Sequence, residues 1–254
     1  MGHRLFERSA KTWRLTSAGQ ALLPHALAMD EDAGRLAGAL TGVEAVARGT
    51  VRVVATDALG VSLAGPLAVL HRENPSLTVE LLATSSVLHY RVGEFDVAVT
   101  LHATRLPQFS TTQIAHSTHR VYTRRDDPQP FRRESDLEGI DAVGYVPELM
   151  DFPEMQFLTN LVPTARTVFR SPNIRAQQEA IAAGVGVGVL PAILGDTDER
   201  LRSVLPEKLS AQSTYWVTVS KAVADTLPVR LVLTRLTNAL DALPGVEVPD
   251  STAR

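Results

Sequence analysis

The chain contains no cysteine and no long run of apolar residues. The lack of cysteine among its 254 residues excludes disulfides, thiolate metal sites and cysteine nucleophiles. No stretch approaches the roughly 18 consecutive apolar residues that a membrane-spanning helix needs, so we expect no membrane partner. The first residues also lack the charged-then-apolar layout of a signal peptide, which predicts a cytoplasmic protein.

Motifs for catalysis and cofactor binding are missing as well. There is no Gly-x-Ser-x-Gly elbow, no His-Glu-x-x-His and no Walker loop. The pattern Gly184-x-Gly186-x-Gly188 follows an expected helix and leads into an expected strand, the reverse of a dinucleotide-binding loop, so Gly184 is interpreted as a helix C-cap. His116 and His119 lie in an extended segment at a spacing that points them to opposite faces, which disfavours a metal site. The sequence predicts no catalytic residue, cofactor or metal.

The charge is unevenly distributed along the chain. The net charge is −3, with 44% hydrophobic and 21% charged residues, as is usual for a soluble globular protein. Residues 1–16 carry four of the 25 basic residues but only one of the 28 acidic ones. The basic residues are Arg4, Arg8, Lys11 and Arg14. On charge alone a solvated tail is the simpler interpretation, and the alternative is an element that contacts phosphates.

A long amphipathic helix is expected over residues 17–48. Thr16 suits the N-cap, because its hydroxyl can accept from a first-turn amide, and Gly49 suits the C-terminal end. Apolar residues recur in alternating steps of four and three, at Leu22, Ala26, Met29, Ala33, Leu36, Leu40, Val43 and Ala47. This spacing is typical of a coiled-coil seam and favours a partner helix over packing on the chain's own domain.

From Thr50 onward, strands and helices alternate, which predicts an α/β fold with a mainly parallel sheet. Strands are expected at 51–55, 77–82, 97–101, 141–146, 165–170, 185–190 and 215–219. Helices are expected at 59–72, 85–93, 153–161, 173–183, from 191, and at 228–242. An extended stretch over 111–124 joins the two α/β sets, and the tail from Pro244 is expected to be loose. Two α/β units joined by two extended crossings are typical of a periplasmic-binding-protein-like sensor with a ligand cleft between its lobes.

The first residues resemble part of a known family of DNA-binding proteins. Leu5-Phe6-Glu7-Arg8 followed by Leu15-Thr16-Ser17-Ala18-Gly19 is similar to the wing and the start of the linker helix in LysR-type transcriptional regulators. In that family a recognition helix precedes this segment, whereas Met1-Gly2-His3 stands where that helix would have just ended. The resemblance therefore implies a truncated helix-turn-helix. We expect Arg4, Arg8, Lys11 and Arg14 to contact DNA phosphates at most, without base readout.

The resemblance extends over the rest of the chain. Four further segments match the family's sensor domain in order and spacing: Gly49-Thr50-Val51-Arg52-Val53, Asn74-Pro75-x-Leu77-x-Val79-x-Leu81, Gly93-Glu94-Phe95-Asp96-Val97-Ala98-Val99 and Ala183-Gly184-Val185-Gly186-Val187-Gly188-Val189-Leu190-Pro191. The family resemblance implies a two-lobe, type 2 periplasmic-binding-protein-like effector domain. It implies a small-molecule effector, a homodimer or homotetramer, and DNA as the partner of the intact architecture.

Effector-binding residues are predicted at the carboxyl ends of the strands, where ligands bind in open α/β sheets and helix N-termini favour anionic groups. These residues are Thr56, Asp57, Ala58, Thr84, Ser85, His102, Arg170 and Ser171. Arg170 is expected to bind a ligand carboxylate through its two-pronged guanidinium. Asp57 replaces the Ser, Thr or Gly usual in the family, so an amino or neutral polar ligand is expected to fit better beside it. For each hydroxyl, simple helix capping is the alternative.

We therefore predict a residual wing at 1–16, a linker helix at 17–48 and an effector-binding domain at 50–254. The domain is divided into lobe one (50–117 and 216–254) and lobe two (118–215). The predicted function is a truncated LysR-type regulator that senses a small effector and changes its oligomeric arrangement on DNA, with weak or no DNA binding by this chain alone. The alternatives are a ligand-binding or dominant-negative fragment, and a solute-binding protein or enzyme on the same fold. Effector, promoter and direction of regulation are left open by the sequence.

Overall fold

A computed structural model describes most of the protein. The described residues are 4–9, 12–23, 25–26, 29, 47–84, 95–149 and 152–249. The expected helix at 85–93, with the predicted site residue Ser85, lies outside them, as does Lys11, one of the predicted phosphate contacts.

The N-terminal segment forms a hairpin that leads directly into a helix. β1 (Phe6–Ser9) pairs antiparallel with β2 (Thr12–Leu15). The Thr16 hydroxyl accepts a hydrogen bond from the amide of Gly19 at 3.1 Å and donates one to the carbonyl of Arg4 at 2.7 Å. The helix begins at residue 17, which confirms the prediction of Thr16 as its N-cap.

The predicted linker helix is described only at its beginning. Residues 17–23, 25–26 and 29 are helical. A glycine is required at position 19, because a Cβ there would lie 2.2 Å from the carbonyl oxygen of Leu5. On the seam, Leu22 and Met29 are 45% and 73% exposed, whereas Ala33, Leu36, Leu40 and Val43 lie outside the described residues. Pairing through this seam stays a prediction.

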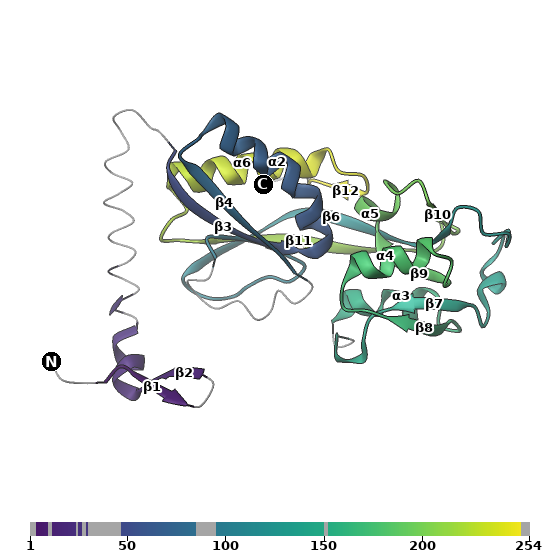
Figure 1. The fold of residues 1–254 in the computed structure, drawn as a ribbon, viewed down its shortest axis with the longest axis horizontal. Helices are drawn as coiled ribbons and strands as arrows, with labels where there is room; N and C mark the ends of the chain where they lie inside the picture. Colours follow the sequence, from purple (N-terminus) through teal and green to yellow (C-terminus); the bar gives the residue numbers. More distant parts are fainter. Residues whose placement is uncertain are drawn as a thin grey trace.

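Lobe one is an α/β unit on parallel strands. β3 (Gly49–Thr56) lies between β4 (Leu77–Thr84) and β5 (Val97–Thr100) and is parallel to both. α2 (Asp57–Glu73) follows β3 and packs beside α6 (Leu227–Asp241), which returns from the C-terminal part of the chain (Figure 1). α2 ends at Glu73 with Asn74 as its C-cap, just before Pro75, where the sequence predicts the helix to stop.

Lobe two repeats the parallel arrangement with different strands. β7 (Asp141–Gly144) lies between β8 (Arg166–Arg170) and β9 (Val187–Pro191). Its helices are α3 (Phe157–Leu161), α4 (Ile174–Ala182) and α5 (Ala192–Gly195). Single 3-10 turns occur at Glu134–Leu137, Pro147–Leu149 and Pro153–Gln156.

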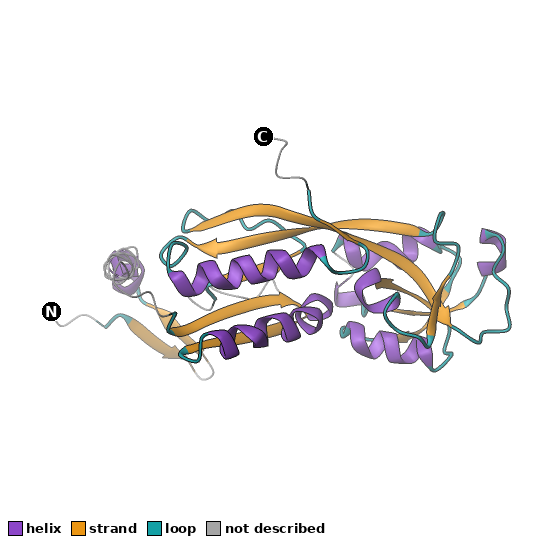
Figure 2. Cartoon of the chain, turned by 90° about the horizontal axis from the view of Figure 1, so that it is seen from above, coloured by secondary structure: helices purple, strands orange, loops and turns teal. Residues whose placement is uncertain are grey.

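Two long strands join the lobes. β6 (Phe109–Arg124) and β11 (Ser210–Ser220) are antiparallel partners and extend from one lobe into the other (Figures 1 and 2). The order of the main sheet is β4-β3-β5-β11-β6-β9-β7-β8. The expectation of a parallel sheet therefore holds for β4, β3 and β5 in lobe one and for β8, β7 and β9 in lobe two. It is wrong for β6 and β11, which run between the lobes in opposite directions and pair antiparallel with each other and with β9 and β5. The register shifts between Tyr215 and Trp216, where the lobe boundary is predicted; the boundaries themselves stay a prediction.

The C-terminal tail is partly ordered, contrary to expectation. β12 (Val246–Glu247) pairs with β6, and the amide of Thr118 donates to the carbonyl of Gly245 at 2.7 Å. The edge of β6 offers backbone groups that need partners, and Gly245 supplies the positive φ of 66° that turns the chain onto this edge. A further short strand, β10 (Leu201–Ser203), also pairs with β6 and was not predicted.

The sheet of lobe one is covered on both faces. Leu59, Leu63, Leu67 and Leu70 form the buried stripe of α2, against the side of β3 that carries Val51 and Val53. On the other side, the rings of Phe95 and Phe109 stack with centroids 5.0 Å apart beneath Val54. None of the helices in the described ranges is long and apolar enough to cross a membrane.

Candidate ligand-binding cleft

A cavity of about 50 Å³ lies where the two lobes meet. The end of β3 and the start of α2 form one wall, and the ends of β7 and β9 with the start of α4 form the other. The lining residues are Thr56, Asp57, Ala58, Leu101, His119, Val143, Gly144, Tyr145, Glu154, Met155, Leu158, Ile174, Gln177, Val189, Pro191 and Tyr215. A water needs roughly 10–15 Å³ of such space, so this cavity accommodates several waters or a small polar group.

Asp57 connects the lobes across this cavity. It is the first residue of α2, where Oδ1 accepts from the amide of Ala58 at 3.0 Å. Its other oxygen, Oδ2, accepts from the amide of Ile174, the first residue of α4 in lobe two, at 3.1 Å. Burial raises the pKa of Asp57, and the backbone donors oppose that rise because they stabilise the carboxylate.

The N-terminus of α4 is held by the chain itself. The side chain of Asn173 accepts from the amide of Ala176 at 3.0 Å and caps the helix. The Ser171 hydroxyl accepts from the Asn173 amide at 3.1 Å, and the buried Gln177 side chain donates to the Ser171 carbonyl at 2.7 Å. Together with Asp57, these contacts satisfy amides that would otherwise attract an anion.

A second polar contact between the lobes lies beside the first. His102 Nε2, which follows β5, lies 2.7 Å from Glu154 Oε1 of lobe two, and the Glu154 side chain is only 10% exposed. The pair is close enough for an ion pair when the imidazole is protonated, although the two atoms do not form a hydrogen bond. Tyr145 stands next to both acids: burial above all, then the charges of Asp57 and Glu154, raise its pKa.

His119 is the third ionisable group in the cavity wall. It is 7% exposed, its ring meets that of Phe157 edge-on at 5.0 Å, and its Nδ1 has no hydrogen-bond partner among the described residues. Burial lowers the pKa of His119 to about 4, so the ring is neutral at neutral pH. His116 lies apart from it and contacts the Gln113 side chain at 2.9 Å. No cluster of three or more metal-ligating groups occurs in the part of the chain that the structure describes.

A second cavity, of about 150 Å³, adjoins the first. The two share Gly144, Tyr145, Met155 and Leu158 as lining residues. Arg170 lines this second cavity, with Thr159 and Thr167, and its Nη1 donates to the Thr167 carbonyl at 3.2 Å. The predicted carboxylate partner therefore lies next to the interlobe cavity and not in its wall.

The predicted site residues are brought only partly together. Thr56, Asp57 and Ala58 line the interlobe cavity, and His102 reaches it through Glu154. Thr84 pairs in register with Thr56, and Ser171 supports the start of α4. Sequence reasoning missed Tyr145, Glu154, Gln177 and Tyr215, and considered His119 only as a metal ligand; no local motif distinguishes these residues, because strands and helices remote in sequence assemble them.

The glycine pattern at the end of α4 has a purely structural explanation. Gly184 has a φ of +83°, its amide donates to the carbonyl of Ile181, and the amide of Val185 donates to that of Ala180, which confirms the predicted helix C-cap. A Cβ at Gly186 would lie 2.0 Å from the carbonyl oxygen of Asp141. These glycines permit close packing of α4, β9 and β7.

Comparison with known proteins identifies the fold's family. A family model described as the LysR substrate binding domain matches residues 44–241. The chain belongs to the LysR family of transcriptional regulators. It is 28% identical over 185 residues to the HTH-type transcriptional regulator ShiR of Corynebacterium glutamicum (strain R), covering 71% of this chain. The chain spans only 58% of the length of ShiR.

Solved structures show the same architecture. Full-length OxyR from Pseudomonas aeruginosa superposes with a TM-score of 0.68 at 17% identity, over 94% of this chain and 82% of that one. The regulatory domain of CrgA from Neisseria meningitidis superposes with a TM-score of 0.63 at 16% identity, over 76% and 98%. This LysR-type chain therefore has the two-lobe, type 2 periplasmic-binding-protein-like fold that the sequence predicts.

Proposed function

We propose that this chain is the effector-sensing part of a LysR-type transcriptional regulator and that it binds a small molecule in the interlobe cleft. One observation carries the proposal: the cavity takes its walls from both lobes, and Asp57 of lobe one already binds the α4 amide of lobe two. A ligand in this position contacts both lobes at once. It therefore favours one arrangement of the lobes over others, which is the differential affinity that a population shift requires.

The site in this proposal centres on Thr56, Asp57 and Ala58. His102 acts through Glu154, Arg170 from the adjoining cavity, and Ser171 by supporting the start of α4. Thr84 and Ser85 complete the set predicted at the end of β4. The residue boundaries of the lobes, 50–117 with 216–254 and 118–215, belong to the same proposal.

Signalling in this proposal passes through oligomers. The exposed Leu22 and Met29 fit a seam by which linker helices pair over residues 17–48 in a homodimer or homotetramer. The intact family architecture binds DNA, whereas this chain contributes at most phosphate contacts by Arg4, Arg8, Lys11 and Arg14. A regulator of this kind acts in the cytoplasm on DNA and has no catalytic role.

The sensing role is tested by thermal unfolding of the whole chain against a panel of acids, amines, aromatics and neutral polar metabolites. A true ligand raises the unfolding temperature, since binding at about 100 times Kd stabilises by about 2.7 kcal/mol. Met155→Trp fills space that both cavities share and is expected to abolish the shift, whereas Leu106→Trp changes an exposed residue and is the control. A panel without a single hit, or a hit that survives Met155→Trp, contradicts the proposed cleft site.

The second candidate role is that of a fragment that pairs with an intact regulator and inhibits it. The exposed seam residues Leu22 and Met29 favour it, because they remain available to a longer partner. Mixing the chain with a full-length paralogue and measuring DNA retention tests this role. Loss of retention supports inhibition, and unchanged retention at a large excess of the chain excludes it. A solute-binding protein or an enzyme on this fold remains the third alternative, to which no observed feature specifically points.

A further inference from the structure

The interlobe cavity is acidic. Asp57 and Glu154 both line it, and no lysine or arginine is among its described lining residues. The only other ionisable side chains in the wall are His119, Tyr145 and Tyr215. Burial favours the neutral forms of all three, so the two carboxyl groups set the formal charge of the lining residues, with His102 Nε2 lying 2.7 Å from Glu154 Oε1.

The backbone donors that could attract an external anion are already occupied. Asp57 Oδ2 accepts from Ile174 at the start of α4, and Asn173 accepts from Ala176 one turn further on. A ligand carboxylate placed here would displace an internal carboxylate or stand beside it, and like charges in a partly buried site repel strongly. A ligand group that donates hydrogen bonds has acceptors available on Asp57 and Glu154.

An unpartnered buried nitrogen supports a ligand in this position. His119 lines the cavity and is 7% exposed, and its Nδ1 makes no hydrogen bond of ordinary geometry with any described residue, although a backbone contact with Ser117 opposes the lowering of its pKa. Buried polar atoms without a partner are rare, and a ligand or a water supplies the partner in most cases. His119 therefore offers a small polar group in the cavity a contact in addition to Asp57 and Glu154.

The adjoining cavity has the opposite character. Arg170 is exposed there and makes no ion pair with any described residue. No acidic residue is among the described lining residues of this second cavity. Between the acidic and the basic end stands a mostly apolar wall of Tyr145, Met155 and Leu158, which both cavities share.

We propose that the ligand is a small ω-amino acid, with its ammonium group beside Asp57 and Glu154, its carboxylate at Arg170 and its apolar chain along Tyr145, Met155 and Leu158. This inference rests on the proposed sensing function and names the ligand class of that site. The separation of the charges into two cavities requires a chain between them, so α-amino acids, which carry both charges on one carbon, bind more weakly. Bidentate pairing with a carboxylate is the geometry for which an arginine is suited.

The first experiment measures binding to the whole chain by calorimetry. The probes are γ-aminobutyrate, δ-aminovalerate and ε-aminocaproate, with valerate and pentylamine as analogues that each lack one charge. At least one amino acid is expected to bind at least tenfold more tightly than both analogues. Equal or tighter binding of valerate or pentylamine, or no binding of any of the three amino acids, overturns the ω-amino acid assignment.

Two variants, each of which removes one charge, test which residue binds the ammonium group and which binds the carboxylate. Glu154→Gln is expected to weaken the best amino acid about tenfold and to leave its preference over pentylamine unchanged, because pentylamine shares the ammonium end. Arg170→Gln is expected to weaken it similarly and to leave its preference over valerate unchanged. Glu138→Gln and Arg132→Gln remove one charge of each sign at exposed positions elsewhere in lobe two and are the matched controls. Each variant is first shown to fold by its circular dichroism, and equal weakening by a control and its test variant contradicts the assignment.

The failure of this inference is distinguishable from that of the sensing function. Hydrogen exchange at the start of α2 and α4 is measured with the full panel of acids, amines and neutral compounds. If another class protects these amides, the cleft senses that class and the ω-amino acid assignment is wrong. If no compound protects them, the sensing function itself is wrong, and the assignment with it.

Discussion

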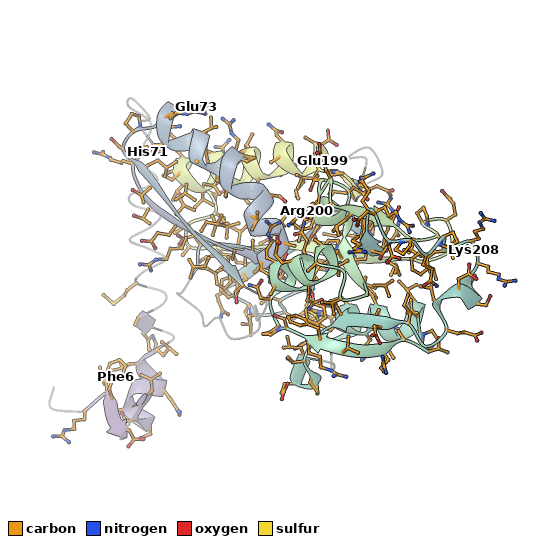
Figure 3. The ribbon with its side chains drawn as sticks, turned by 45° about the vertical axis from the view of Figure 1, so that its right-hand side comes forward. Phe6, His71, Glu73, Glu199, Arg200 and Lys208 are labelled. Atoms are coloured by element: carbon orange, nitrogen blue, oxygen red, sulfur yellow. The ribbon has the colours of Figure 1, made fainter. Side chains whose placement is uncertain are left out.

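The two lobes have similar α/β arrangements but are held together differently. Lobe one buries a leucine stripe of α2 against its sheet and α6, and its described ion pairs are Arg52–Glu80 and Arg235–Glu73. Lobe two shares this apolar cluster through α4 and α5 and has a smaller apolar cluster of its own. It also has several charged contacts at its surface: Arg120–Asp196, Arg124–Asp126, Arg133–Asp136, Arg166–Asp141, Arg200–Glu179, Arg200–Asp198 and Lys208–Glu134. Figure 3 shows Arg200 beside lobe two's helices and Lys208 at its outer end.

The difference between apolar packing and surface ion pairs affects which lobe can shift its structure more easily. Apolar packing of helices on a sheet is dense and resists small shifts. Exposed ion pairs are weak individually and are screened by salt. The connections between the lobes are β6, β11, the apolar contacts of α2 with α4 and α5, and the polar contacts of Asp57 and His102. We expect lobe one, which holds the leucine stripe of α2, to be the stable body against which lobe two moves.

The largest expected effect tests the apolar packing of lobe one. Leu63→Ala removes a side chain of α2 that is 0% exposed and should lower the free energy of unfolding by about 2–5 kcal/mol. Val61→Ala, on the same helix at 49% exposure, is the control and should change it little. Chemical denaturation measures both. Equal losses in the two variants would contradict the assignment of α2's buried face.

The next effect concerns the pH dependence that His119 gives to the cleft. The pKa of His119 is lowered from 6.5 to about 4, so the unfolded chain binds this proton more tightly than the folded one. Its contribution to stability is therefore full above pH 6.5 and is lost as pH falls, amounting to about 3 kcal/mol between pH 7 and pH 4. In denaturation at both pH values, His119→Gln should lose less stability on acidification than the wild type, by about this amount.

His116→Gln provides the matched control for this measurement, since it removes a partly exposed histidine from the same strand, β6. It should keep the pH dependence of the wild type. If the wild type and His119→Gln lost the same stability on acidification, the buried His119 ring would not be the cause of that loss.

A smaller effect is expected at the cap of α4, which both lobes hold. Asn173→Ala removes the side-chain acceptor of the Ala176 amide and should cost about 1 kcal/mol. Asn160→Ala, an exposed position of α3, is the control. Hydrogen exchange should locate the loss in the first turn of α4, next to the contact with Asp57. Faster exchange spread evenly over both lobes would argue against a local cap.

The smallest effect tests the charged contacts of lobe two. Arg200 makes paired hydrogen bonds of 2.8 Å with both oxygens of Glu179 and also contacts Asp198. Arg200→Met should lower the unfolding temperature slightly at low salt, and the difference from wild type should shrink in about 1 M sodium chloride, where screening is nearly complete. Arg230→Met, which changes an exposed arginine of α6 without an ion pair to any described residue, is the control. A salt-independent difference would mean that Arg200 stabilises through packing of its aliphatic stem.

Part of the site could be predicted because its residues lie at the end of a strand that the sequence already indicates. Thr56, Asp57 and Ala58 stand where β3 ends, and a strand end in an α/β sheet faces the cleft whatever its sequence. Arg170 is also at a strand end, as the last residue of β8, but β8 is the outermost strand of lobe two and its end faces the adjoining cavity. Glu154 and His119 were beyond prediction, because a 3-10 turn and a crossing strand bring them to the cavity from distant parts of the sequence.

The sequence by itself determined the family, the alternation of strands and helices, and the caps at Thr16 and Gly184, because these depend on local periodicity and on hydrogen bonds within a turn. The tertiary structure alone decided that Asp57 binds the amide of Ile174, and that acidic and basic cavities adjoin across Tyr145. It also decided that residues after Pro244 return as β12 to the edge of β6. These features depend on which distant groups the packing of the two lobes brings within bonding distance, and no local pattern encodes that distance.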